Sequence, residues 1–254
     1  MKTRILLLTA LAALPVLCRA QGAQSALETD FSTRTSIAVD KRLSKGLHLE
    51  AEYELRTENA LSKIDRHQAS LGLSYKFTDW LKGDLSYTFF DRYGTTAGWE
   101  PRHRLSGSLT FGYRAGDWRF SLRGMAQLTH KTEDLNVWQE TRNLVTLKSR
   151  FKVQYKGCSN LEPYGLLELK TILNDPLYSS GSFAGYTHAY ITRYRGGLGL
   201  EWKFSPQHAL NVYGLLDYNY TVDIDANRAG TVLKGVGTGR VLNTTLGVGY
   251  TFSF

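Results

Sequence analysis

Hydrophobic and polar residues alternate along most of this chain, most regularly in the last segment, residues 241–254. A period of two places alternate side chains on opposite faces of an extended strand. The same alternation recurs in ten further arms: Leu200 and Trp202, for example, face away from Glu201 and Lys203. The sequence therefore predicts an all-β protein built from long two-faced strands.

The last arm ends on an aromatic residue with no turn or tail after it. This pattern resembles the C-terminal signal strand that the assembly machinery of outer-membrane β-barrels recognises. The alternative is a soluble edge strand packed on a core, but soluble strands average only about five or six residues. We expect the assembly signal to consist of Leu246, Val248, Tyr250, Phe252 and Phe254.

The connections between the arms alternate in length. Short connections are expected at 44–46, 78–79, 114–117, 156–160 and 205–207. Long connections are expected at 58–65, 92–101, 131–139, 173–187 and 223–240. Short periplasmic turns alternating with longer outer loops are typical of an outer-membrane barrel.

The short connection after Ser44 means that the first and last arms run in the same direction. Antiparallel closure would then need one more strand, for which the weak segment 22–30 is the candidate. Odd strand counts are rare in such barrels. We therefore predict a single antiparallel transmembrane β-barrel of about 12 strands (10–12).

The polar face of each arm carries many charged residues and needs water. A soluble sandwich or lipocalin would provide that water outside the sheet, and a membrane barrel would provide it in the lumen. The arms, of about 11–16 residues, favour the membrane barrel because a tilted strand needs roughly 9–11 residues to cross hydrocarbon.

The N-terminus is typical of an export signal: Lys2 and Arg4 precede the apolar run 5–17, and small side chains favour cleavage after Ala20. A lipoprotein alternative would acylate Cys18, but Leu17 fits poorly before it. The predicted division is a signal peptide at 1–20, an N-terminal segment and possible first strand at 21–31, and the barrel at 32–254.

Charge and cysteine content add little to this picture. Loss of the leader lowers the formal charge of +8 by three, to +5, and leaves Cys158 without a disulfide partner. No basic stretch forms a recognisable nucleic-acid module. We expect no cofactor, no metal and no nucleic acid. The expected partners are outer-membrane lipid and, during biogenesis, periplasmic chaperones and the barrel assembly machinery.

Charged side chains on the polar faces are the main candidate site. Rings of such charges can select ions or small anions. The alternative, which we favour because both signs are abundant, is a ladder of ion pairs that fills and stiffens a narrow lumen. The expected lumen charges are Arg56, Arg66, Arg102, Arg104, Arg123, Arg142, Arg150, Glu168, Arg193, Arg195, Glu201 and Asp217.

Aromatic residues cluster beside the short connections. Amphipathic rings prefer headgroup depth, so we expect them to form an interfacial girdle on the periplasmic side. Its members are Trp80, Tyr113, Trp118, Tyr155, Trp202 and Phe204.

Catalytic and metal signals are weak. Of the six histidines only His48 shares the predicted lumen face, and no Gly-x-Ser-x-Gly motif occurs. The segment 223–227 has the alternating oxygens of a calcium loop, but Arg228 replaces the expected glycine. We therefore expect a non-enzymatic protein.

Five short motifs, in order and spacing, resemble a Gram-negative outer-membrane barrel family catalogued as domain of unknown function 2490. They are Glu54-Leu55-Arg56, Arg102-His103-Arg104-Leu105, Leu147-Lys148-Ser149-Arg150, Glu162-Pro163-Tyr164 and Tyr194-Arg195-Gly196-Gly197-Leu198-Gly199. The resemblance implies an outer-membrane barrel and supplies no catalytic residues. The expected role is structural or a narrow passage for small solutes. The alternatives are a lipase- or protease-like enzyme and a barrel that binds surface ligands with its long loops.

Overall fold

The computed structural model describes residues 27–94 and 98–254, so the expected signal peptide at 1–20 lies outside the described residues. The described chain forms eleven β-strands. They are β1 (Glu28–Ser44), β2 (Leu47–Glu58), β3 (Lys63–Lys76), β4 (Leu81–Gly94), β5 (Gly98–Ala115), β6 (Trp118–Lys131), β7 (Asn143–Tyr155), β8 (Leu161–Ser179), β9 (Ser182–Lys203), β10 (His208–Ala226) and β11 (Leu233–Ser253). In this part of the chain no helix is long and apolar enough to cross a membrane.

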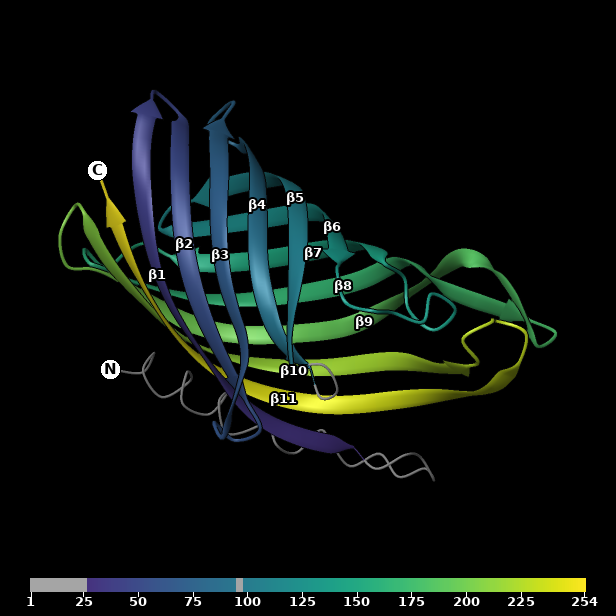
Figure 1. The fold of residues 1–254 in the computed structure, drawn as a ribbon. Helices are drawn as coiled ribbons and strands as arrows, with labels where there is room; N and C mark the ends of the chain where they lie inside the picture. Colours follow the sequence, from purple (N-terminus) through teal and green to yellow (C-terminus); the bar gives the residue numbers. More distant parts are fainter. Residues whose placement is uncertain (1–26, 95–97) are drawn as a thin grey trace.

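The strands form one closed barrel in which each strand pairs with its neighbours in sequence (Figure 1). Consecutive strands are antiparallel. The barrel closes between β1 and β11, which run parallel from the pair Glu28↔Val241 to the pair Asp40↔Ser253. Every strand therefore has a hydrogen-bonded neighbour on both sides.

The predicted fold class is confirmed, with one difference: the described residues contain eleven strands where the sequence suggested about twelve. As the short turn after Ser44 indicated, the first and last strands run in the same direction. Direct parallel pairing satisfies both edges, so no additional upward strand is needed. Residues 28–30, which fell in the segment considered for that strand, are the beginning of β1.

Small polar side chains join the two strands at this closure. The hydroxyls of Ser32 and Thr245 lie 2.7 Å apart, and Ser32 also donates to Asn243 Oδ1 at 3.1 Å. The Thr245 side chain is completely buried. At the end of the chain, Arg42 N donates to Phe254 O at 2.8 Å. The closure is therefore held by side chains as well as by the backbone ladder.

The short connections are present, and we call the end of the barrel that carries them the turn end and the opposite end the loop end. Two predicted long loops are much shorter. Strands β8 and β9 continue through 173–187 to the two-residue turn Ser180–Gly181, in which both residues have positive φ (52° and 77°). This is the backbone of a tight hairpin turn that matches strand twist. Strands β10 and β11 likewise reduce 223–240 to a loop at 227–232, so β8 to β11 extend past the other strands (Figure 1).

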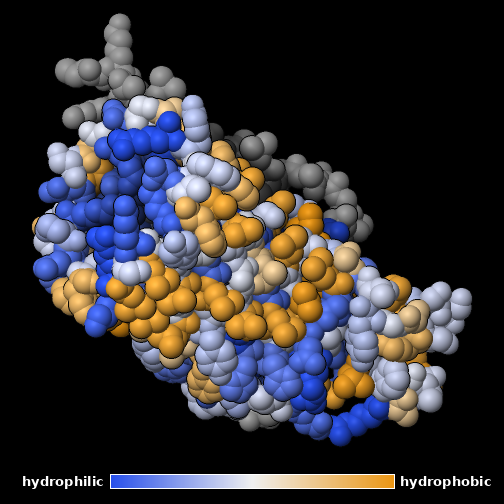
Figure 2. Space-filling view, turned by 90° about the horizontal axis from the view of Figure 1, so that it is seen from above, coloured by the Kyte–Doolittle hydropathy of each residue, from blue (hydrophilic) through white to orange (hydrophobic). Residues whose placement is uncertain are grey.

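The polarity of the barrel is inverted relative to a soluble protein. Within the described residues, six apolar or aromatic side chains are buried, against eighteen polar or charged ones. Apolar side chains such as Leu85, Leu167 and Leu198 face outward and are 57%, 64% and 52% exposed. Figure 2 shows hydrophobic side chains gathered in a band across the outer surface, bordered by hydrophilic zones. The alternation along the strands therefore separates an apolar outer wall from a polar interior.

Candidate functional site

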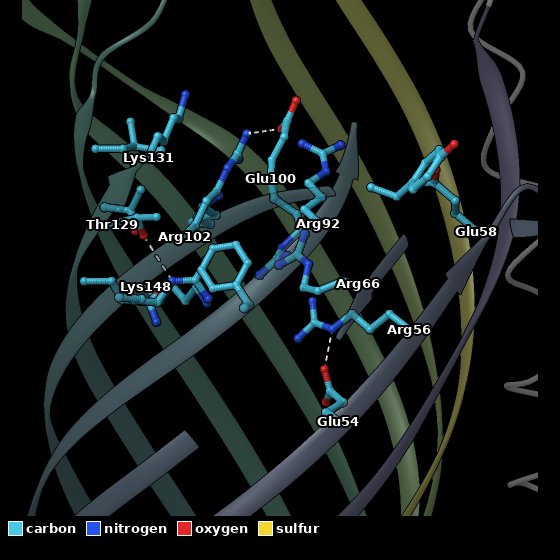
Figure 3. Close-up of a pocket in the computed structure, with 18 of the residues that line it drawn as sticks. Glu54, Arg56, Glu58, Arg66, Arg92, Glu100, Arg102, Thr129, Lys131 and Lys148 are labelled. Atoms are coloured by element: carbon cyan, nitrogen blue, oxygen red, sulfur yellow. Dashed lines mark hydrogen bonds and ion pairs between the residues drawn. The ribbon is translucent and has the colours of Figure 1, made fainter. Parts of the chain in front are cut away.

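The interior contains a cavity of about 1160 Å³ towards the loop end. The inward faces of strands on every side of the barrel contribute to its wall. Figure 3 shows Arg56, Arg66, Arg102 and Lys148 extending into the same opening from different strands. A second cavity of about 520 Å³ continues towards the turn end. Both are lined by Arg56, Arg104, Lys148 and Arg150, so the two spaces meet within the lumen.

One row across four strands alternates in charge and pairs completely. Arg150 on β7, Glu168 on β8, Arg195 on β9 and Asp217 on β10 are direct neighbours in register. Arg195 donates two hydrogen bonds of 2.6 Å to Asp217, and Arg150 Nη2 lies 2.6 Å from Glu168. Such bidentate, charge-assisted contacts are among the strongest in proteins. We call these four residues the paired row.

The next row towards the loop end carries three cations in succession: Lys148 on β7, Lys170 on β8 and Arg193 on β9. Arg193 donates to Glu168 of the paired row at 2.7 Å. Within the described residues, neither lysine side chain forms an ion pair or a hydrogen bond. We call these three residues the cationic row. Like charges placed directly opposite each other are unfavourable in a sheet, so this row is not explained by stability.

Phe90 organises two further arginines on another part of the wall. It faces inward from β4 and is almost fully buried. The guanidinium groups of Arg66 and Arg104 lie 5.0 Å and 4.5 Å from its ring centroid. Arg104 also donates to Thr129 Oγ1 at 3.1 Å. A cation within about 6 Å of a ring centroid is attracted to the aromatic face, so Phe90 helps to hold both guanidinium groups in place.

The loop between β6 and β7, residues 132–142, contributes to the wall at the loop end. Its Glu133 and Glu140 form ion pairs with Arg102 and Lys131. Burial opposes ionisation of Glu140, but the Lys131 ammonium group outweighs it and lowers the pKa of Glu140. Asn136 of the same loop donates to the carbonyl oxygen of Ala226 at 2.9 Å. The loop is therefore tied to both the barrel wall and the β10–β11 connection.

The structure places most of the predicted lumen charges in these two cavities. The larger cavity is lined by Arg56, Arg66, Arg102, Arg104, Arg150, Arg193 and Arg195. Arg123 and Glu168 line the cavity towards the turn end, and Asp217 pairs with Arg195. Glu201 lies at the turn end, where it accepts from Gln154 at 3.2 Å. Arg142 differs: it precedes β7 and donates to the carbonyl oxygen of Lys131 at 3.0 Å, so it holds the loop.

Several lumen residues were not among the predicted set. They are Arg34, Phe90, Lys131, Tyr164, Lys170 and Tyr213. Parity along each strand could have placed them, since Phe90 follows Thr88 and Lys170 follows Glu168 at a spacing of two. Phe90 was missed because it adjoins the outward Phe89, which obscures the alternation.

The predicted girdle residues lie on strand ends or connections at the turn end. Trp80, Tyr113, Trp118, Trp202 and Phe204 are all exposed. The rings of Trp118 and Tyr155 are 5.0 Å apart. The predicted assembly-signal residues Leu246, Val248, Tyr250 and Phe252 share the outer face of β11, and Phe254 follows it directly.

A second set of aromatic residues, which is not part of the predicted girdle, lies on the outer wall towards the loop end. Tyr53 and Tyr87 form 2.6 Å hydrogen bonds with His67 and His103, respectively. The neighbouring rings of Tyr93 and Trp99 are 5.4 Å apart. The barrel therefore carries aromatic residues at both ends of its outer wall.

The weaker candidates have ordinary structural surroundings. His48 Nδ1 lies 3.1 Å from Asp40 on the lumen side. The segment 223–227 is largely part of β10 and pairs with β11. Within the described chain no group of three histidine, cysteine or acidic residues could hold a metal ion. Cys158 is a free, exposed thiol in a connection at the turn end.

Comparison with solved structures finds membrane barrels at low identity. A structure of the NanC porin is 14% identical with a TM-score of 0.48, and covers 90% of this chain and 100% of its own. OmpT of Vibrio cholerae is 13% identical with a TM-score of 0.36, over 78% of this chain and 58% of its own. An anion-selective porin from Comamonas acidovorans is 12% identical with a TM-score of 0.35, over 82% and 55%.

Comparison of the sequence gives a family. No curated protein matches the chain significantly. The model of a family described as "Protein of unknown function (DUF2490)" matches residues 31–228, which covers most of the barrel. The resemblance expected from the five short motifs is thereby confirmed, and the chain belongs to the DUF2490 family.

Proposed function

We propose that this protein is a non-enzymatic, integral outer-membrane barrel whose lumen is a narrow passage for small anions. The observation that carries the proposal is the charge of the larger cavity. Fourteen arginine and lysine side chains line it, against seven aspartate and glutamate side chains. A confined, water-filled path with an excess of one sign concentrates the opposite ion.

The support for a membrane location comes from the outer wall. Each strand contributes exposed apolar side chains to it. The strands have 12 to 22 residues, and roughly 9–11 residues are enough for a tilted strand to cross hydrocarbon. Closure satisfies the backbone hydrogen bonds that lipid cannot satisfy. Aromatic residues at both ends fit two membrane interfaces. A Gram-negative outer membrane is the location that these features favour.

The alternative role is a structural barrel with a filled lumen. The paired row supports it, because Arg150, Glu168, Arg195 and Asp217 stiffen one side of the wall. The ladder does not extend through the lumen, however, since the cationic row beside it contains no acid and, within the described residues, the side chains of Lys148 and Lys170 form no ion pair. The two joined cavities also leave open space beside the ladder. We therefore favour a passage.

The Arg102→Glu variant tests this proposal. Arg102 lines the larger cavity and pairs with Glu133 of the β6–β7 loop. In a planar lipid bilayer under a potassium chloride gradient, we expect the unmodified protein to show a reversal potential with the sign of chloride selectivity. Arg102→Glu should move that potential towards zero, because it replaces a cation by an anion inside the passage.

The Lys45→Glu variant is the matched control, because it makes the same change of charge in the exposed turn between β1 and β2. Its reversal potential should equal that of the unmodified protein. A correctly inserted barrel without conductance, or one that selects potassium, would refute the proposed passage.

Deletion of Phe254 tests the proposed assembly signal. Phe254 N donates to Asp40 O at 3.0 Å, and Lys41 Nζ lies 5.3 Å from the Phe254 ring centroid. We expect the deletion to reduce the amount of folded barrel in the outer membrane severalfold. The readout is heat-modifiable migration of the outer-membrane fraction on electrophoresis.

Leu43→Ala serves as a control, because it removes an exposed apolar side chain from the last turn-end residues of β1. It should leave outer-membrane levels unchanged. Refolding of the Phe254 deletion into detergent separates recognition from stability: normal refolding with poor cellular assembly supports a signal. Normal outer-membrane levels of the deletion would count against it.

A further inference from the structure

The cationic row is the feature of the lumen that the passage alone does not require. Lys148, Lys170 and Arg193 occupy one register across three adjacent strands. Side chains in such positions are typically about 4.5–5.5 Å apart at Cβ, and like charges there repel. All three line the larger cavity, so their charged groups share one space.

The paired row shows that these strands can satisfy such charges. Arg150, Glu168 and Arg195 lie on the same three strands, at a spacing of two residues from the cationic row. They alternate in sign and form ion pairs. The same three strands therefore carry one row that is neutralised within itself and one row whose three members are all cations, of which Arg193 pairs with Glu168 of the paired row. The run of neighbouring cations on these three strands is therefore confined to one depth of the lumen, that of the cationic row.

Several donor atoms around this row also have no hydrogen-bond acceptor. Within the described residues, Arg193 Nε is buried without a hydrogen bond, the side chains of Lys148 and Lys170 donate none, and Arg66 Nε has no hydrogen bond but lies 3.5 Å from Asp65 Oδ2. Arg66 and Arg104, which lie over the Phe90 ring, line the same cavity as Lys170. Five cationic groups thus surround one part of the cavity with unused hydrogen-bond capacity.

We propose that the cationic row, together with Arg66 and Arg104, binds a multiply charged oxyanion of the phosphate class. This inference rests on the proposed function and names the anion that the passage selects. A phosphate or phosphate monoester carries about −1.5 to −2 charges near neutral pH and offers at least three acceptor oxygens. A monocarboxylate offers one charge and two oxygens, and so satisfies fewer of these donors.

Titration calorimetry of the refolded protein in neutral detergent at low ionic strength tests the site directly. The probes are inorganic phosphate, glycerol phosphate and acetate. We expect both phosphates to bind and acetate to bind at least about tenfold more weakly, because it loses charge-assisted hydrogen bonds. Binding of glycerol phosphate but not of inorganic phosphate would identify an ester as the ligand, and the reverse result would identify the free ion.

The double variant Lys148→Gln/Lys170→Gln should weaken phosphate binding by at least about tenfold. Because it removes repulsion between neighbouring cations, it should fold as well as the unmodified protein. Lys152→Gln is the matched control. Lys152 lies on the same strand and face as Lys148, but its ammonium group lies 4.0 Å from the Tyr164 ring centroid. Its phosphate affinity should be unchanged.

Equal affinity for phosphate and acetate, or full phosphate affinity in the double variant, would overturn the site. This failure is distinguishable from failure of the passage. A barrel that is chloride-selective in the bilayer but does not distinguish phosphate from acetate retains the passage and loses the site. A barrel that binds phosphate through Lys148 and Lys170 but does not conduct retains the site and loses the passage.

Discussion

Replacement of Glu168 by glutamine should be among the most destabilising single changes in the barrel. The Glu168 side chain is 2% exposed and lies within 3.5 Å of charged nitrogen atoms of Arg150, Arg193 and Arg195. The amide of glutamine keeps one acceptor but removes the negative charge, which leaves three guanidinium groups without their shared counter-ion. Loss of one partner from a buried ion pair costs about 3–5 kcal/mol.

Urea unfolding of the protein in lipid vesicles measures this effect as a lower midpoint for Glu168→Gln. Glu201→Gln is the control, since the Glu201 side chain is 28% exposed and contacts Lys203 at 3.3 Å. Exposed pairs of this kind contribute about 0–1 kcal/mol, so its midpoint should stay close to that of the unmodified protein. An unchanged midpoint for Glu168→Gln would contradict the central role given to the paired row.

The side to which each residue points could be predicted from the sequence because a strand has a strict period of two. Arg150, Glu168 and Arg195 were placed in the lumen by parity alone, and the structure places them there. The alternation is harder to recognise where two similar residues adjoin, as at Phe89 and Phe90, although Phe90 keeps the parity of Thr88. Parity does not apply to Arg142, which precedes the strand and contacts the loop backbone.

Which residues become neighbours could not be predicted, because register is a property of strand pairs. Lys148 and Arg150 are equivalent by parity, yet Lys148 lies opposite Lys170 and Arg150 lies opposite Glu168. The difference between a neutralised row and a cationic one depends on that pairing. The parallel closure was missed for the same reason: the direction of β1 was deduced, but its pairing with β11 was not.

The amino-acid composition at the loop end did not indicate that the strands continue there. Residues 173–187 are rich in glycine, serine and tyrosine, which suggested an irregular loop. Ser180–Gly181 satisfies the positive φ angles of a tight hairpin turn, so β8 and β9 continue to it. Tyr178 at this extension donates to the carbonyl oxygen of Trp138 at 2.9 Å. A contact with a loop 40 residues away therefore supports a hairpin that local sequence did not indicate.

Glycine and tyrosine alternate in one row of the lumen near the closure. Tyr164, Gly199, Tyr213 and Gly247 are successive neighbours from β8 to β11, and Arg34 on β1 follows them. A Cβ at Gly199 would meet the ring of Tyr164, and one at Gly247 would meet the ring of Tyr213. Each tyrosine therefore lies over the glycine of the next strand, an arrangement that protects a glycine within a sheet.

Gly247→Val should therefore destabilise the barrel at its closure. The new side chain would occupy the space of the Tyr213 ring and displace it towards the cavity, which Tyr213 already lines. Overpacking of this kind costs about 1–3 kcal/mol, and here it acts on the strand that pairs with β1. Refolding into detergent, followed by urea unfolding of the folded fraction, measures both the yield and the midpoint.

Gly124→Val is the matched control, because Gly124 is exposed in the middle of β6 and a Cβ there meets nothing within 4 Å. Valine also has the higher strand propensity, so this variant should be as stable as the unmodified protein or slightly more stable. Gly247→Ala should lie between the two, since a single methyl group needs a smaller shift of Tyr213. If Gly247→Val unfolds at the same midpoint as Gly124→Val, the packing of the Tyr213 ring over Gly247 does not contribute to stability. Closure would then be held by the β1–β11 backbone ladder and the Ser32–Thr245 contact alone.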